Sequence, residues 1–237
     1  EQDLLVQTAI EVAGREALVF AGVGGNDTRR CVERTLKVKE LGASGSLAVV
    51  PYYSRPSFEG CFEHFKALSE CRLPVIVYYH PLRTGLSLTP DQLAKVLKLP
   101  SVVGVKDCSG KLSYASEVMS LSTRPLFTGN DAQALPFIAS GAKGLVSSLA
   151  NLFPRSWNSM VEAALDADIE KALALFKPME SLCEAMELES NPQGVKYAMS
   201  LMDLCRADLR LPMTIPHQKV RDRIEKELSF LQPLVSV

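Results

Sequence analysis

The chain of 237 residues is 47% hydrophobic and 22% charged, so it can bury a large core as one α/β barrel or as two smaller domains. Its formal net charge of -1, with no segment dense in lysine and arginine, argues against nucleic acid or an anionic membrane surface as the main partner. A small molecule is therefore the expected partner, and no apolar run reaches the roughly 18 residues that span a membrane.

Apolar patterns along the chain predict helices and strands in alternation. After an opening helix, six β-branched runs read as strands of a parallel sheet, and helices are expected between them. Only helical patterns follow the sixth strand. The expected strands are residues 17–23, 46–53, 74–79, 102–106, 125–128 and 143–148. The expected helices are residues 2–13, 26–41, 60–70, 90–97, 113–121, 131–140, 154–165, 169–188, 192–204 and 217–231.

Two parallel architectures fit this alternation. A doubly wound sheet needs a glycine-rich phosphate turn, and residues 22–27 fail because Asp27 stands where the third glycine would fall. A (β/α)8 TIM barrel places functional groups at the carboxyl ends of several strands, as Tyr53, Tyr78 and Lys106 do here. We therefore expect residues 1–153 to form barrel units three to eight, with the first two units absent, and residues 154–237 to form a helical extension.

Lys106 is the most unusual residue of these strands, because it ends an apolar run where valine or isoleucine is expected. Side chains alternate faces in a strand, so Lys106 shares a face with Gly104, which we expect to leave open space beneath the amine. Apolar surroundings would favour the neutral, nucleophilic amine that Schiff-base chemistry needs. Taken alone, the run favours the alternative of a surface lysine that extends into solvent.

Tyr78 and Arg83 form a second feature at the end of the preceding strand. A phenol can relay protons, and an arginine pairs with a carboxylate through two parallel hydrogen bonds. Each residue alone has an ordinary structural interpretation, as a core aromatic or a solvated cation. The three histidines and six cysteines lie scattered without metal-ligand spacing, so we expect no bound metal and reduced thiols of a cytoplasmic protein.

Two segments together resemble one known family. Residues 78–85 read YYHPLRTG and residues 103–110 read VGVKDCSG, which is similar to the two signature segments of the dihydrodipicolinate synthase and N-acetylneuraminate lyase family. The likeness continues in residues 50–56, 129–132, 144–151, 191–196 and 209–213, and so covers nearly the whole chain. The resemblance implies a (β/α)8 barrel with a helical extension that works as a class I aldolase.

What the resemblance implies is condensation of pyruvate with an aldehyde, without a cofactor, through a covalent imine on Lys106. Tyr78 would shuttle protons, aided by Tyr53 from the neighbouring subunit of a homodimer or homotetramer. Arg83 would bind the carboxylate of the second substrate. Gly129 and the backbone around Val146 would line the pyruvate pocket.

Arg83 is similar to the synthase branch, which implies L-aspartate 4-semialdehyde as the aldehyde and lysine and diaminopimelate biosynthesis as the route. The alternatives are another pyruvate aldolase, acting on N-acetylneuraminate or 2-keto-3-deoxy sugar acids, and a non-catalytic barrel fragment. Two departures from the family pattern stand out. The relay threonine segment would precede Glu1, and residues 79 and 80 differ from the asparagine and small apolar residue that the synthases commonly carry. Separately, Arg30 falls where lysine-regulated relatives carry an acid near Asn26, which predicts weak or absent lysine inhibition.

Overall fold

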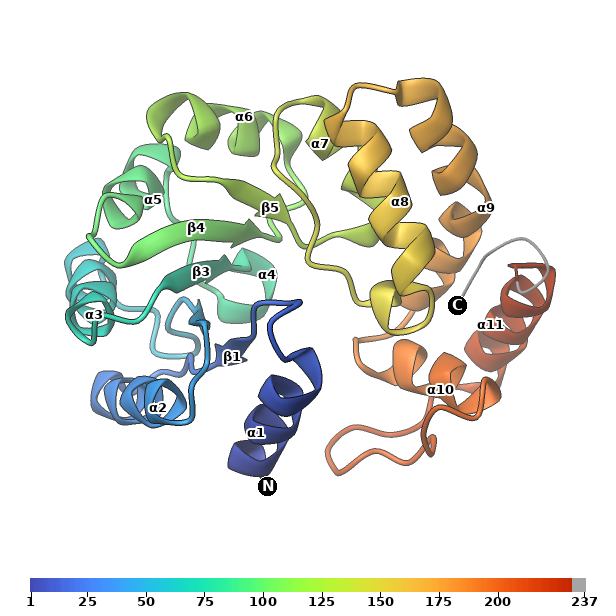
Figure 1. Cartoon of the computed structure of the whole chain (residues 1–237), viewed down its shortest axis with the longest axis horizontal. Helices are drawn as coiled ribbons and strands as arrows, with labels where there is room; N and C mark the ends of the chain where they lie inside the picture. The colour runs from blue at the N-terminus through green and yellow to red at the C-terminus, as the bar shows by residue number, and fades with distance from the viewer. Residues whose placement is uncertain (232–237) are drawn as a thin grey trace. The chain divides into compact units, whose positions relative to one another are not determined.

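The computed structural model describes residues 1–231, and five strands of that part form one sheet in chain order (Figure 1). They are β1 (Phe20–Gly22), β2 (Gly45–Val49), β3 (Val75–Tyr79), β4 (Val102–Asp107) and β5 (Leu126–Thr128). The first four pair in parallel, and the order β1-β2-β3-β4-β5 never reverses. A doubly wound sheet reverses its order at a switch point, so the sequential order agrees with the predicted barrel-type parallel sheet.

Helices that connect the strands cover one face of this sheet (Figure 1). Ala48, Val77 and Val105, which lie side by side in the ladder, face the helices and are fully buried. The alternate residues Tyr78 and Lys106 point to the other face and are half-buried. The sheet therefore presents its chemical groups on the helix-free face. The covering helices are α2 (Thr28–Glu40), α3 (Phe58–Glu70), α5 (Pro90–Leu97) and α6 (Leu112–Leu121).

The prediction that Tyr53 ends the second strand is wrong. β2 stops at Val49, although the ladder continues for one more hydrogen bond, from the Val50 amide to the Tyr78 carbonyl. Pro51 has no N–H to donate, and Tyr53 takes a left-handed conformation with φ 68°, so neither can continue a strand. Tyr53 therefore lies in the loop after β2.

The predicted sixth strand at residues 143–148 is also wrong within the described structure. It is reduced to one parallel bridge, between Thr128 and Leu145. The backbone amides of Ser148 and Leu149 donate instead to the Asp131 carboxylate, at 3.0 and 3.3 Å. Amides that donate to a side chain cannot also donate to a neighbouring strand, so the segment leaves the sheet there.

The helices largely follow the sequence pattern. α1 (Gln2–Ala13), α5 and α8 (Pro154–Leu165) have the predicted bounds. The predicted helix at residues 131–140 divides into the 3-10 turn η1 (Asp131–Gln133) and α7 (Ala134–Ala139), and the one-turn helix α4 (Pro81–Thr84) was not expected. The remaining helical elements are η2 (Leu149–Asn151), α9 (Ile169–Glu187), α10 (Gln193–Leu201) and α11 (Gln218–Leu231).

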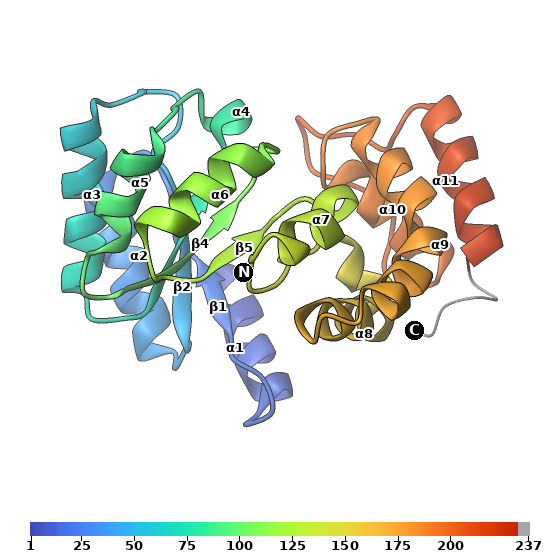
Figure 2. The ribbon, with the colours of Figure 1, turned by 90° about the horizontal axis from the view of Figure 1, so that it is seen from above.

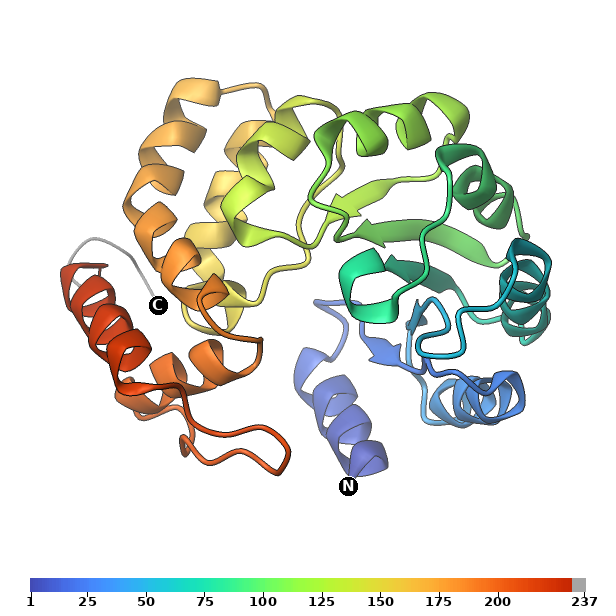
Figure 3. The ribbon, with the colours of Figure 1, turned by 180° about the vertical axis from the view of Figure 1, so that it is seen from behind.

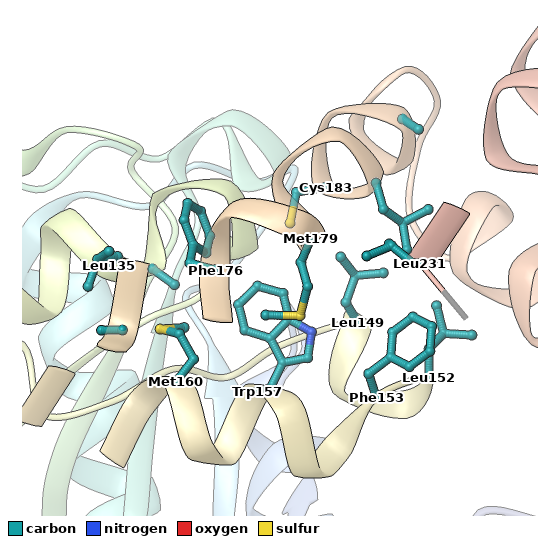
Figure 4. Close-up of a cluster of buried hydrophobic side chains, with 14 of the residues drawn as sticks. Leu135, Leu149, Leu152, Phe153, Trp157, Met160, Phe176, Met179, Cys183 and Leu231 are labelled. Atoms are coloured by element: carbon teal, nitrogen blue, oxygen red, sulfur yellow. The ribbon is translucent and has the colours of Figure 1, made fainter. Parts of the chain in front are cut away.

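The described residues divide into two compact units, Glu1–Phe127 and a second unit from Thr128 onward. In the second unit α9, α10 and α11 lie side by side, and Figure 2 shows this group. Its apolar core is centred on Trp157 of α8, whose ring meets the edge of Phe176 at 6.3 Å between centroids. Figure 4 shows Met160 and Met179 beside these rings. No helix among residues 1–231 is long and apolar enough to cross a membrane.

Gly104 fills a packing role that the sequence did not reveal. The expected open space beneath Lys106 is absent, because a Cβ on Gly104 would lie 2.9 Å from the Pro125 carbonyl oxygen and 3.3 Å from the Phe127 ring. The same carbonyl accepts the Val105 amide at 3.0 Å, so it is held in place by the ladder. Glycine is therefore required for the close approach of β5 to β4.

Gly104→Ala is expected to lower the free energy of unfolding by about 1–3 kcal/mol, because the added methyl group overpacks against fixed backbone. Denaturant unfolding monitored by circular dichroism measures the change. Gly22→Ala in β1 is the matched control, since no atom lies within 4 Å of its Cβ position. Equal stability of the two variants would contradict the packing argument.

Candidate active site

Tyr78 and Lys106 are direct neighbours at the carboxyl ends of two adjacent parallel strands. The ladder pairs Tyr78 of β3 with Lys106 of β4, so both side chains point to the helix-free face. The Lys106 Nζ atom lies 4.3 Å from the centroid of the Tyr78 ring, within the range of a cation–π contact. The sequence predicted both residues, and the first unit brings them together.

The surroundings of Tyr78 keep its phenol protonated. Burial raises the pKa of Tyr78 to about 12, and the nearby Cys108 raises it further while the Arg83 charge opposes the shift. The Tyr78 hydroxyl also hydrogen-bonds with the Cys108 thiol. At neutral pH this phenol is therefore a neutral group beside an amine, able to donate a proton or pass one on.

Arg83 lies on α4, the one-turn helix that follows β3. Pro81 starts this turn with its fixed φ, and Gly85 ends it in the left-handed conformation at φ 69°. Figure 3 shows α4, in teal, at the carboxyl ends of the strands. The Arg83 side chain is exposed, and its charge influences both Tyr78 and Cys108. The guanidinium therefore lies at the rim of the Lys106 face.

The residues next in sequence to Tyr78 and Lys106 support the opposite face. Tyr79 and Asp107 pair in the ladder and are 2% and 1% exposed. The Tyr79 hydroxyl donates to the Leu88 carbonyl and accepts from the Leu88 amide, both at 3.2 Å, and its ring stacks on Tyr114. The Tyr79 side chain therefore packs in the wall behind the strand and does not reach the Lys106 face.

The structure adds two residues to the Lys106 face that the sequence reasoning did not assign to it. The His80 and Tyr78 rings form a T-shaped pair, at 5.8 Å between centroids. Cys108 stands two residues after Lys106, and the alternation of a strand would have placed it on the same face. Burial raises the pKa of Cys108 to about 11, although Lys106 opposes the shift, so the thiol is protonated at neutral pH.

Tyr53 lies in the same unit, with its side chain in solvent. Its backbone amide donates to the Thr84 carbonyl at 3.4 Å, which ties the loop after β2 to α4. The side chain is 89% exposed, and Leu82 on α4 is 87% exposed. A large aromatic side chain that is 89% exposed has little to contact within its own unit.

Gly129 and Val146 belong to the second unit, where they lie next to each other in the backbone network. The Val146 amide donates to the Thr128 carbonyl at 2.8 Å, and Gly129 follows Thr128 directly. Asp131 fastens this turn to the start of η2 through the Ser148 and Leu149 amides. Within residues 1–231, no three histidine, cysteine or acidic side chains gather so as to hold a metal ion.

The fold and the paired lysine and tyrosine define an α/β protein of the TIM-barrel class. The model of the Dihydrodipicolinate synthetase family matches residues 1–231, and the chain belongs to that family. The 4-hydroxy-tetrahydrodipicolinate synthase of Geobacter sp. (strain M21) is 39% identical over 216 residues, which cover 90% of this chain and 74% of the relative.

Two further comparisons agree with this family. The 4-hydroxy-tetrahydrodipicolinate synthase of Methanospirillum hungatei JF-1 is 36% identical over 232 residues, which cover 97% of this chain and 80% of the relative. The solved structure of the 4-hydroxy-tetrahydrodipicolinate synthase from Methylacidiphilum fumariolicum SolV superposes with a TM-score of 0.95 at 31% identity. The superposition covers 98% of this chain and 79% of that structure.

Proposed function

We propose that this protein condenses pyruvate with L-aspartate 4-semialdehyde to form 4-hydroxy-tetrahydrodipicolinate, as a lyase of lysine and diaminopimelate biosynthesis. The observation that carries the proposal is the contact of the Lys106 amine with Tyr78 at the strand ends of a family member. The relatives that match over most of the chain bear the name of this synthase, which favours it over the sugar-acid aldolases of the same family.

In the proposed mechanism Lys106 is the nucleophile. Its neutral amine attacks the ketone carbon of pyruvate, and the adduct loses water to form the imine. Loss of a proton from the pyruvate methyl group then gives an enamine, whose carbon attacks the aldehyde carbon of the second substrate while the aldehyde oxygen takes up a proton. The amine of that substrate then attacks the imine carbon, which closes the ring and releases the Lys106 amine. Tyr78, whose hydroxyl lies on the same face as the amine, moves protons in these steps.

Borohydride trapping tests the chemistry, and a choice of aldehydes tests the substrate. Pyruvate with borohydride is expected to leave a reduced adduct on Lys106, found by peptide mass spectrometry. Coupled assays then compare L-aspartate 4-semialdehyde with N-acetylmannosamine and glyceraldehyde. If no adduct forms, the protein is the non-catalytic alternative. If an adduct forms but the assay prefers N-acetylmannosamine or glyceraldehyde, the protein is another pyruvate aldolase of the family.

Arg83→Lys is expected to raise the KM for L-aspartate 4-semialdehyde about tenfold while leaving the KM for pyruvate unchanged. Lysine keeps the positive charge but loses the planar fork that pairs with a carboxylate through two hydrogen bonds. Steady-state kinetics with each substrate varied in turn measures the effect. Arg72→Lys is the control, because Arg72 is exposed in the turn before β3, at the other end of the strand. If both variants had the same KM for L-aspartate 4-semialdehyde, Arg83 would have no role in binding that substrate.

The remaining assignments also belong to the proposal. Gly129 and Val146 contact pyruvate, and Tyr53 completes the proton relay of a second copy in a homodimer or homotetramer. The exposure of Tyr53 supports such an interface. Mixing inactive Tyr53→Phe and Lys106→Arg proteins tests it, because mixed dimers would regain active sites that combine one intact copy of each residue.

Other expectations stay predictions: the absence of a cofactor, a cytoplasmic location, weak lysine inhibition, and a division into a barrel at residues 1–153 and an extension at 154–237. The chain spans 74% and 80% of its two relatives named above. That two βα units with a relay threonine precede Glu1 is likewise a prediction, which sequencing upstream of the first codon tests.

A further inference from the structure

His80 lies on the Lys106 face but has no role in the proposed mechanism. Its ring forms a T-shaped pair with Tyr78. Burial lowers the pKa of His80, and the charges of Arg83 and Lys106 are close enough to lower it further. The imidazole is therefore near Lys106 and Arg83, which bind the two substrates, and near Tyr78, which moves protons; it is neutral at physiological pH.

The backbone of His80 is fixed to the helix that carries Arg83. The His80 carbonyl accepts the Arg83 and Thr84 amides, both at 3.1 Å, and the Thr84 hydroxyl at 3.0 Å. The buried Thr84 side chain anchors this turn from inside. His80 and Arg83 are thus held by one short rigid element and present their side chains together.

The burial of one ring nitrogen decides which tautomer His80 adopts. The Nδ1 atom is buried and makes no hydrogen bond of normal geometry. The backbone acceptor that acts on the ring is the His80 carbonyl, and it is already occupied by the amides of Arg83 and Thr84 and by the Thr84 hydroxyl. A proton at this position would bury an N–H without an acceptor, which is more costly than burying a bare nitrogen. The neutral ring therefore carries its proton on Nε2 and acts as a hydrogen-bond donor there.

We propose that His80 is a specificity-determining residue, which donates through Nε2–H to an oxygen of the aldehyde substrate whose carboxylate binds Arg83. The inference rests on the proposed function and deepens it. A neutral donor beside a guanidinium favours an aldehyde whose far end is rich in acceptors. It does so without adding a third positive charge next to Lys106.

Three variants test the proposal in the intact protein. His80→Val removes the donor, and it is expected to raise the KM for L-aspartate 4-semialdehyde about tenfold while the KM for pyruvate changes less than twofold. His80→Gln places an amide N–H near the position of Nε2, so it should restore the KM to within threefold of wild type. His80→Asn places its amide near the position of Nδ1 and should behave like valine.

Borohydride adducts of pyruvate on Lys106 distinguish a failure of the His80 proposal from a failure of the proposed function. An adduct in all four proteins, with the selective loss and the rescue by glutamine alone, supports the proposal. The role of His80 would be overturned if the adducts form but the aldehyde KM of His80→Val is unchanged. It would also be overturned if His80→Val raises the KM of both substrates equally, or if asparagine restores the aldehyde KM. A wild-type protein without an adduct would overturn the proposed function, and the inference with it.

Discussion

Lys106→Arg is expected to abolish condensation, with kcat/KM falling by on the order of 10⁴-fold or more. Arginine keeps a long basic side chain at the position that contacts the Tyr78 ring, so the substitution is conservative in size. The guanidinium stays protonated in proteins and offers no nitrogen lone pair for attack on the ketone. The measurement is the coupled assay together with borohydride trapping, in which the variant should show no pyruvate adduct.

Lys111→Arg is the matched control for this prediction, because Lys111 is exposed and lies only five residues further along the chain. We expect it to keep wild-type activity and the adduct. If Lys106→Arg retained the adduct, another amine would be the nucleophile, and the contact between Lys106 and Tyr78 would be structural.

Tyr78→Phe is expected to lower kcat by about 10²- to 10⁴-fold, the usual contribution of one general acid–base group. The ring that contacts Lys106 remains, and the lost atom is the hydroxyl that moves protons. Because the pKa of Tyr78 is raised to about 12, the wild-type hydroxyl stays protonated through neutral pH, and its ionisation should not limit the rate there. Single-turnover kinetics measures the loss directly.

Tyr79→Phe is the matched control, because it removes the hydroxyl of the adjacent tyrosine, whose side chain lies on the opposite face of the strand. The Leu88 carbonyl would keep its bond from Tyr114, but the Leu88 amide would lose its acceptor. We therefore expect Tyr79→Phe to lower the free energy of unfolding by about 1–3 kcal/mol with little change in kcat. A similar kcat loss in both variants would show that Tyr78 acts through packing.

Several features of the structure depend on contacts between distant segments, which the local sequence pattern does not reveal. Gly104 was expected to leave space beneath Lys106, yet the carbonyl of Pro125, just before β5, occupies that position. The sixth strand was expected from its apolar residues, yet Asp131 takes the amides that would have extended it. In both cases the competing atom comes from a distant part of the chain, and the pattern of one segment does not report it.

The sequence by itself determined the alternating elements, the parallel sheet and the position of Lys106 and Tyr78 at strand ends, because hydrophobic period and turn residues act locally. It could not determine which residues stand opposite one another, since register depends on pairing between segments about 30 residues apart. The alternation of side chains along a strand already implies that Tyr79 faces away from Tyr78 and that Cys108 shares the face of Lys106. Only the folded sheet set Tyr78 directly opposite Lys106.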